Sequence, residues 1–459
     1  METQFKHARL YILFLLIFFL ITCTGGTNEK RQLKNITIDN DSIAVEMEHA
    51  LIHEFNPWYP LSVDSVYGGF LSNINYKWEP DGGQNKFIVT QARHIWSTSN
   101  AAMYYNNPEL TKIAEHGFYF LKEIMWDKKF GGFYDLTDRV GIPIPEGGEI
   151  IKKAYGNAFA IFGLSVYYKA SGNEEALKLA RETFNWIEKN CYDPEYGGYF
   201  QFIARNGEPF KDGYGGVAPK DQNSSIHILE AFTELYKVWP DQKLRERLTS
   251  LLHIIRDTIT TEKGYLVLFS RRNWTPISFR NADKATRDSN YYFDHVSYGH
   301  DVETAYLMLE ASEVLGIHND TVTLKIAKKM VDHALQNGWD QEYGGIYDGG
   351  YYFDNDKKAA VVRDTKEWWA QAEAFNSFLL MSRLFPNDKT NYYEKFCKQW
   401  EYVKKYLLDK EYGGWYHGGI DKVPDEKYSP KSTIWKCNYH TSRSLINCLK
   451  ILKSKELQD

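Results

Sequence analysis

Apolar and polar positions alternate with a helical period over long stretches of the chain. Segments 109–126 and 174–189 carry charges on one side and apolar residues on the other, as in helices with one buried face. The segments that precede them, 90–105 and 153–170, are apolar or small on every side, as in helices buried on both sides. The pattern therefore predicts pairs of helices, each with an inner and an outer member.

A short motif separates these pairs: an aromatic residue, two glycines and another large apolar residue. Its copies begin at Tyr67, Phe130, Tyr196, Lys263, Tyr343 and Tyr412, and the copy at Lys263 is degenerate, with one glycine. Glycine adopts positive φ at little cost and aromatic residues favour strands, so each copy predicts a turn into a short strand or hairpin. Copies 63 to 80 residues apart indicate a repeated supersecondary unit.

Counting helices gives the fold class. One helix near 41–55 precedes the first motif, two lie in each of the five intervals, and one near 432–453 follows the last motif. We therefore predict an all-α (α/α)6 barrel of six inner and six outer helices, closed by pairing of the first and last helices, with the hairpins crossing one end. An open solenoid of helix pairs is the alternative. The single helix at each end favours closure.

The N-terminus has the pattern of an export signal. Lys6 and Arg9 precede an apolar run at 10–22, and a polar stretch follows Cys23. We expect 1–22 to be a signal peptide of lipoprotein type, 23–39 a flexible linker and 40–455 a single catalytic domain. Cys23 would carry the lipid and anchor an exported protein to a bacterial membrane, in the periplasm or at the cell surface. Thr22 departs from the usual Gly or Ala, so a plain secretory signal or an uncleaved anchor is the alternative.

Composition excludes several classes of function. The net charge is −5 and the body of the chain has no basic run, which argues against nucleic acid as a partner. The four cysteines beyond Cys23 form no CxxC pair, and no metal-binding, phosphate-binding or nucleophile-elbow motif is present, so we expect no metal or cofactor. Aromatic residues make up 16% of the chain, which suits a thick core and also the apolar faces of sugars.

Polar and aromatic side chains cluster at the start of each helix that follows a motif. If these helices form the inner ring, the clusters meet at one mouth of the barrel, and since buried ionisable groups cost free energy without partners, we expect a site there. The candidate residues are Arg93, Tyr155, Asn157, Asn223, His227, His300, Glu303, Trp368, Trp369, Glu373, Trp435, Tyr439, His440 and Arg443.

These residue types suit proton transfer. Histidine is the side chain whose ordinary pKa lies near neutral pH, so His300 and His440 on opposite sides of a sugar would remove a proton from one face and return it to the other. Glu303 lies three residues after His300 on the same helix face and is expected to hold its ring. Arg93 would stabilise negative charge on oxygen.

The stretches SYGHDVE, KEWWAQAEA and WKCNYHTSR resemble the N-acylglucosamine 2-epimerase superfamily, and most closely its cellobiose and mannobiose 2-epimerase branch. The resemblance covers roughly residues 40 to 455. It implies an (α/α)6 barrel without metal or organic cofactor that inverts C2 of a reducing-end sugar through the open-chain aldehyde and a cis-enediolate.

Roles follow from the resemblance by matching residues. It implies that His300 and His440 are the acid/base pair, that Glu303 supports His300, that His227 assists ring opening and that Arg93 binds the enediolate oxygens. The substrate-stacking tryptophans would be Trp435 and one of Trp368 and Trp369. We expect Tyr155, Asn157, Asn223, Glu373, Tyr439 and Arg443 to bind the substrate.

Four alternatives stay open at this point. The same histidines would serve an N-acylglucosamine 2-epimerase or an aldose–ketose isomerase of monosaccharides. A glycoside hydrolase would need a carboxylate pair, for which Asp301, Glu303 and Glu373 are available. A sugar-binding lipoprotein would have lost its chemistry. The export signal and an insert at 270–296 depart from the family pattern. We expect a monosaccharide or oligosaccharide substrate and a monomer or dimer.

Overall fold

The computed structural model describes residues 40–353 and 356–454. The predicted signal peptide at 1–22, the lipidation site at Cys23, the linker at 23–39 and the last residue of the predicted domain lie outside the described residues. The described residues gather into one compact unit. None of their helices combines the length and the apolar character that crossing a membrane requires.

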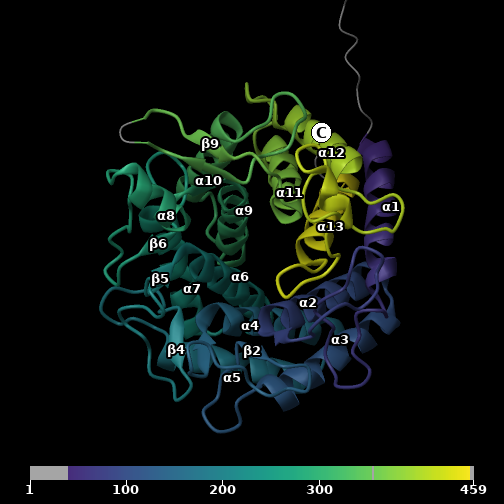
Figure 1. The fold of residues 1–459 in the computed structure, drawn as a ribbon, viewed down its shortest axis with the longest axis vertical. Coiled ribbons are helices and arrows are strands. Elements are labelled where there is room, and N and C mark those ends of the chain that lie inside the picture. Colours follow the sequence, from purple (N-terminus) through teal and green to yellow (C-terminus); the bar gives the residue numbers. More distant parts are fainter. Residues whose placement is uncertain (1–39, 354–355, 455–459) are drawn as a thin grey trace, which may run out of the picture. The chain divides into compact units, whose positions relative to one another are not determined.

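The helices form two concentric rings (Figure 1). The inner ring consists of α2 (Ile88–Tyr105), α4 (Ala154–Ser171), α6 (Gln222–Val238), α9 (Tyr298–Val314), α11 (Trp368–Leu384) and α13 (Tyr439–Lys453). Each inner helix packs against the next, and α13 packs against α2, so the ring is closed.

The outer ring consists of α3 (Pro108–Phe120), α5 (Glu174–Asn190), α7 (Gln242–Ile254), α10 (Thr321–Asn337), α12 (Tyr392–Tyr406) and α1 (Asn40–Trp58). Five of them pack against the inner helix that precedes them in the chain, and α1, purple in Figure 1, packs against the yellow α13. The predicted (α/α)6 barrel, closed by its first and last helices, is confirmed.

Two segments differ from the sequence-based prediction. The last helix was expected from residue 432 but begins at Tyr439, because Ser432 pairs with Ile74 in an antiparallel bridge and draws the preceding segment into a loop. The insert at 270–296 contains a helix that the periodicity did not predict, α8 (Lys284–Asp294). Single π-helical turns at Leu121–Met125 and Ile255–Ile259 extend α3 and α7, and a 3₁₀ helix lies at Pro424–Tyr428.

Short antiparallel strands join successive units at the end of the barrel where the inner helices begin. Each strand before an inner helix pairs with a segment that follows the next hairpin. The pairs are β1 (Lys86–Phe87) with β2 (Leu136–Thr137), β3 (Ile151–Lys153) with β4 (Phe202–Ala204), β5 (Lys220–Asp221) with β6 (Phe269–Ser270), and β7 (Val296–Ser297) with β8 (Gly349–Tyr351), which also pairs with β9 (Ala360–Arg363).

The repeated motif forms the predicted hairpins. In the second copy, Gly131 and Gly132 have φ of 67° and 70°, and Trp126 pairs with Phe133 across the turn. A Cβ atom on Gly132 would lie 2.5 Å from the Trp186 ring, so both conformation and space require glycine there. The degenerate fourth copy closes with the same kind of bridge, between Thr260 and Leu266.

Buried ion pairs fix five of the six hairpins among the described residues. In the second unit, Lys152 Nζ lies 3.0 Å from Asp127 Oδ2 and donates to the carbonyl oxygen of Gly131. The other pairs are Lys86 with Asp64, Lys220 with Asp193, Lys366 with Asp340, and Lys431 with Asp409. The fourth unit has Val296 and Thr261 at the corresponding positions, so it replaces the ion pair with two uncharged side chains.

A polar side chain from an inner helix adds a second anchor. Asn157 Oδ1 accepts from the backbone N–H of Phe133 at 2.8 Å, and its Nδ2 donates to the carbonyl of Lys153. Both ends of the amide are therefore used inside the protein. We expected Asn157 to bind substrate, and the structure corrects this: its helix face points to the hairpin. Gln91, Asp301 and Gln371 anchor the hairpins at Phe70, Leu266 and Ile346 in the same way.

Candidate active site

A cavity of about 430 Å³ lies where the inner helices begin. Most of the predicted site residues line it: Arg93, Tyr155, Asn223, His227, His300, Glu303, Trp368, Trp369, Trp435 and His440. A second cavity of about 320 Å³ adjoins the first, because Tyr155, Asn223, Tyr292, His300 and Trp435 line both. The predicted convergence of six helix starts at one mouth is therefore present.

His300 lies in the first turn of α9. Its Nδ1 atom is 2.7 Å from Ser297 Oγ, and its ring packs against Trp369 with centroids 4.7 Å apart. Burial lowers the pKa of His300 to about 3, and the nearby His227 and Arg93 act in the same direction, so the ring is neutral at pH 7. Its Nε2 atom has no hydrogen-bond partner among the described residues.

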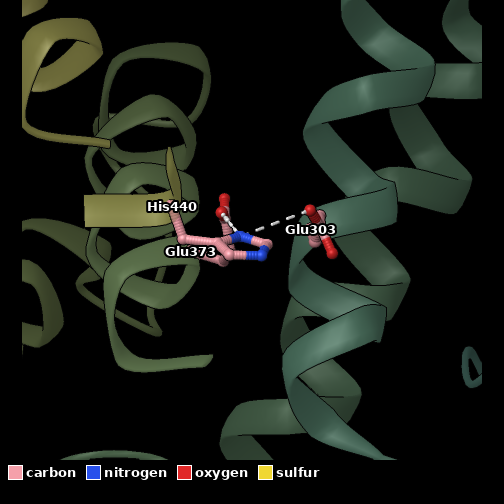
Figure 2. A group of neighbouring side chains, drawn as sticks. All are labelled: Glu303, Glu373 and His440. Carbon is pink, nitrogen blue, oxygen red and sulfur yellow. Dashed lines mark hydrogen bonds and ion pairs between the residues drawn. The ribbon is translucent and has the colours of Figure 1, made fainter. Parts of the chain in front are cut away.

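The expected contact between Glu303 and His300 is not present. Glu303 Oε1 instead accepts from Arg443 Nη2 at 2.5 Å and lies 3.8 Å from His440 Nδ1 (Figure 2). A buried carboxylate gains more from a charge-assisted bond to a guanidinium than from a neutral imidazole, which explains the orientation. The His300 ring lies within hydrogen-bond distance of Ser297 instead.

His440 lies in the first turn of α13. Its Nδ1 atom is 2.6 Å from Glu373 Oε1, on the neighbouring helix α11 (Figure 2). An ionised carboxylate only accepts hydrogen bonds, so Nδ1 carries the proton and Nε2 is left with its lone pair. Burial holds the pKa of His440 well below its usual range. Its ring packs against the same Trp369, at 5.7 Å between centroids.

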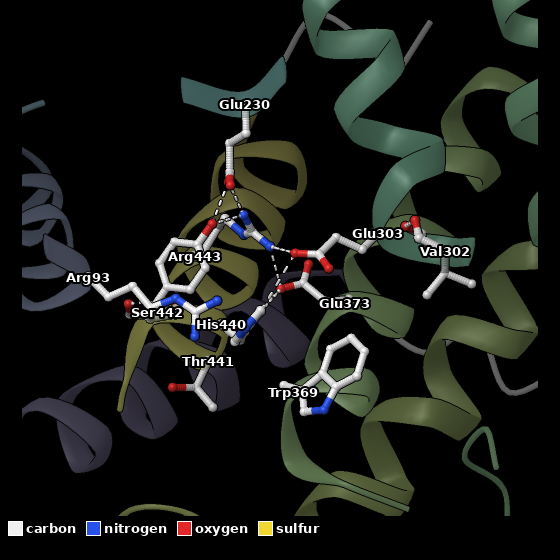
Figure 3. A network of polar contacts seen from close by, with 12 residues as sticks. Arg93, Glu230, Val302, Glu303, Trp369, Glu373, His440, Thr441, Ser442 and Arg443 are labelled. Atoms are coloured by element: carbon white, nitrogen blue, oxygen red, sulfur yellow. Dashed lines mark hydrogen bonds and ion pairs between the residues drawn. The ribbon is translucent and has the colours of Figure 1, made fainter. Parts of the chain in front are cut away.

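Arg443 lies behind the cavity among three carboxylates (Figure 3). Its Nη2 donates to Glu303 Oε1 at 2.5 Å and to Glu373 Oε1 at 2.6 Å, and its Nη1 bonds to Glu230 and to the hydroxyl of Tyr439. Burial opposes the charge of the guanidinium, but Glu373 and the other acidic groups hold the pKa of Arg443 well above its ordinary value. Burial also raises the pKa of Glu230 and of Glu373.

This geometry changes the expected roles of three residues. Glu373, Tyr439 and Arg443 were expected to bind substrate, but none of them lines the cavity. They form its buried support instead. Glu303, Glu373 and His440 present three possible metal-ligand atoms within 4.8 Å of one another. Because the Arg443 guanidinium already bonds to both carboxylates, it supplies the positive charge that a cation would bring.

His227 and Arg93 complete the polar wall. His227 Nδ1 lies 2.8 Å from Glu230 Oε2 within α6, and burial lowers the pKa of His227 to about 3. The Arg93 guanidinium lies over the rings of Phe159 and Tyr439, at 4.4 and 4.9 Å from their centroids, and its Nη2 is 3.2 Å from the hydroxyl of Tyr155. Among the described residues Arg93 has no carboxylate partner, so its charge is available to an anionic oxygen.

Trp369 forms the wall shared by the two histidines. Its Nε1 donates to Glu367 Oε2 at 2.8 Å, which fixes the ring. A Cβ atom on Gly299 would lie 2.7 Å from the Trp369 ring, which explains the glycine before His300. Trp368 is buried and packs against His417, whereas Trp435, on the loop before α13, is 52% exposed at the mouth.

Residues 68–443 match the N-acylglucosamine 2-epimerase (GlcNAc 2-epimerase) family. The chain belongs to this family. The cellobiose 2-epimerase of Ruminococcus albus is 32% identical over 420 residues, covering 89% of this chain and 97% of the relative. That of Dictyoglomus turgidum is 28% identical over 416 residues, covering 88% and 97%. The structure of the cellobiose 2-epimerase from Spirochaeta thermophila superimposes with a TM-score of 0.76 at 28% identity, covering 90% and 97%.

These likenesses confirm the enzyme class as well as the fold. The relatives are carbohydrate epimerases, which are isomerases, so this member of the N-acylglucosamine 2-epimerase family is a sugar epimerase by class.

Sequence reasoning missed four residues at this epimerase site. Tyr292, Glu367 and His417 line the cavity, and Ser297 holds His300. Tyr292 comes from α8 in the insert, is 65% exposed and lines both cavities. The aromatic run at 291–293, after a polar stretch at 280–290, was its signal in the sequence.

Proposed function

We propose that the protein inverts C2 of the reducing-end glucose or mannose unit of a β-1,4-linked disaccharide of the cellobiose or mannobiose type. The carrying observation is the arrangement of His300 and His440. Both rings are neutral, both pack on Trp369, and each has Nδ1 bound by the protein, while Nε2 has no hydrogen-bond partner within residues 40–353 and 356–454. Membership of the N-acylglucosamine 2-epimerase family supports the same reaction.

The reaction balances with these residues alone. In the open-chain aldehyde, Nε2 of one histidine takes the C2 proton; the C–H electron pair forms the C1–C2 double bond, and the carbonyl pair moves to O1. The other histidine, neutral at rest, first takes up a proton from water and then gives it to the opposite face of C2. The electrons return and the carbonyl reforms on the epimer. Each turnover leaves the proton on the first histidine, so exchange with water restores the starting state.

Charged neighbours lower the energy of the intermediate. Arg93 has no carboxylate partner and lies in the cavity wall, where it would stabilise the enediolate oxygens. Glu373 would stabilise the imidazolium form of His440 through the Nδ1 hydrogen bond. His227 would assist ring opening from the same wall.

A hydrolytic function has less support from the geometry. Asp301 Oδ1 accepts from the backbone N–H of Leu266 and its Oδ2 lies 3.6 Å from His333, so the carboxylate is used outside the cavity. Glu303 and Glu373 both bond to Arg443. None of these three carboxyl groups is therefore free to form the pair that flanks a glycosidic bond in hydrolysis.

The test is isotope incorporation. The purified protein is incubated in D2O with cellobiose, mannobiose, glucose, mannose or N-acetylglucosamine, and NMR follows product and label. We expect deuterium at C2 of the reducing-end epimer, and its loss in His300→Ala and in His440→Ala. A ketose product would mean reprotonation at C1, and cleaved glycosidic bonds would assign a hydrolase; either result rejects the proposal.

We also propose export and lipid attachment at Cys23, on the basis of the charged and apolar pattern that precedes it. The substrate would then be met outside the cytoplasm. Labelling cells with a radioactive fatty acid should mark the wild-type protein and not Cys23→Ser. Recovery of the wild-type protein entirely in the cytosol would reject this proposal.

A further inference from the structure

The two candidate histidines have Nδ1 partners of different chemistry. His440 faces the carboxylate of Glu373 at 2.6 Å, and His300 faces the hydroxyl of Ser297 at 2.7 Å. A carboxylate only accepts a hydrogen bond, so it suits a ring whose Nδ1 always carries a proton. A hydroxyl both donates and accepts, so it matches every protonation state and both tautomers of the ring. The two bases are therefore supported differently.

Ser297 does not use its hydroxyl as its position predicts. It is the residue before α9, the N-cap position at which serine usually accepts from a helix N–H. No such bond is present, although Asp221, Asp241 and Asp320 cap α6, α7 and α10 in this way. Among the described residues, the Ser297 hydroxyl bonds only to His300. The first turn of α9 therefore has no side-chain cap from Ser297, and the hydroxyl bonds to the His300 imidazole instead.

The backbone fixes the position of this hydroxyl. Ser297 is 7% exposed and lies in β7, where it pairs with Gly349 of β8. Gly350, next to it, has no room for a side chain because a Cβ atom would collide with the hydroxyl of Tyr298. The strand pair therefore approaches α9 closely and holds Ser297 in one place relative to the first turn of the helix.

We propose that Ser297 is the positioning residue of His300. Its hydroxyl holds the ring against Trp369. When His300 takes a proton from the substrate at Nε2, the hydroxyl accepts a hydrogen bond from Nδ1–H. It donates to Nδ1 when Nε2 carries the proton of the neutral ring. The His300 ring thus changes its protonation state without losing its hydrogen bond to Ser297. The predicted effect on kcat rests on the proposed epimerase function. The hydrogen bond between Ser297 and His300 does not depend on that function.

The experiment compares Ser297→Ala, Ser297→Gly and Ser297→Thr with wild type in the full-length protein. Glycine is included because it replaces serine at an N-cap at little cost, so a folded variant without the hydroxyl is obtained. The matched control is Ser225→Ala, a buried serine in the first turn of α6 whose hydroxyl bonds to a backbone carbonyl. NMR of ¹⁵N-labelled histidine, assigned with His300→Gln, reports the tautomer of the ring, and steady-state kinetics with cellobiose report kcat and KM.

We expect the alanine and glycine variants to shift the Nδ1 and Nε2 signals of His300 and leave those of His440 in place. We expect kcat to fall by about tenfold or more, part of the 10²–10⁴-fold that a positioned acid–base group contributes, with KM unchanged. Threonine should restore both readouts, and Ser225→Ala should change neither. Unchanged His300 signals in Ser297→Gly would overturn the proposal, as would a wild-type kcat. If the wild type epimerises no sugar, the proposed function fails, and the NMR comparison still decides the role of Ser297.

Discussion

His440 Nδ1 and Glu373 Oε1 lie 2.6 Å apart and join α13 to α11 at the back of the cavity. The carboxylate sets the Nδ1–H tautomer and stabilises the imidazolium. Glu373→Gln keeps the size of the side chain but offers an amide that donates as well as accepts. We predict that kcat for epimerisation falls about a hundredfold or more while KM changes little, because a mis-set tautomer removes the base rather than the binding site.

Glu310→Gln is the control for this change, since Glu310 lies on the inner helix α9 but bonds to Lys237 outside the cavity. Steady-state kinetics give kcat and KM of both variants, and these are compared with the wild-type values. A kcat of Glu373→Gln equal to that of the control would contradict the prediction.

Tyr292 lines both the inner cavity and the adjoining one, and its side chain is mostly exposed. We expect a ring in this position to pack against the second sugar unit of a disaccharide substrate. We predict that Tyr292→Ala raises KM for cellobiose about tenfold, which corresponds to about 1.4 kcal/mol, and changes KM for glucose much less. The control is Tyr428→Ala, an exposed tyrosine that packs against Tyr76. Equal effects on both sugars would show that Tyr292 does not contact the second unit.

The ion pair of Lys220 and Asp193 is fully buried. The fourth unit has two uncharged residues in place of such a pair. We predict that Lys220→Val lowers the free energy of unfolding by about 3 kcal/mol, because the buried carboxylate of Asp193 loses its buried cation and keeps Arg272 and the backbone N–H of Glu195. Adding Asp193→Thr should recover more than half of the loss, because Thr261 and Val296 occupy these positions in the fourth unit. Urea denaturation measures both variants, and a double variant no more stable than the single one would be the contrary result.

His94 is buried against Phe70 and bonded to Tyr59, away from the cavity lining. Burial lowers the pKa of His94 to about 3, below the ordinary value near 6.5 of the unfolded chain. As the pH falls below 6.5, His94 becomes protonated in the unfolded state but stays neutral in the folded state. The contribution of neutral His94 to stability is therefore complete above pH 6.5 and is lost as the pH falls towards 3. We predict that His94 alone lowers the free energy of unfolding by about 2 kcal/mol when the pH changes from 7 to 5.

The comparison uses His94→Gln. Its free energy of unfolding, measured with urea at several pH values, should fall by about 2 kcal/mol less than that of the wild type over this range. Parallel curves for the two proteins would show that His94 does not carry this pH dependence.

The barrel was predictable from the sequence because helical periodicity repeats in every unit and a glycine pair in five of the six. The positions of individual side chains were harder to derive. Asn157 lies one helical turn from the mouth, and nothing in its spacing distinguishes a hairpin anchor from a ligand-binding amide. The three-residue spacing of His300 and Glu303 indicated a shared face, but the guanidinium that attracts Glu303 comes from a residue 140 positions later.

Tyr292 and Ser297 show the other limit. The insert that carries Tyr292 has no repeat counterpart, so its helix had no pattern to match. Ser297 was not among the predicted site residues; it occupies the N-cap position of α9, and its hydroxyl bonds to the His300 imidazole rather than to the helix. Periodicity locates elements, whereas the partner of a polar side chain depends on contacts between distant segments.

The pairing of α1 with α13 has a consequence for the order in which the protein is made. Glu230, Glu303 and Glu373 are all synthesised before Arg443, the cation that bonds to them. A nascent chain therefore holds three carboxylates without their common partner until its last helix leaves the ribosome. Ring closure and assembly of the histidine pair then occur in one final step, so an incomplete chain has neither a closed barrel nor a reactive site.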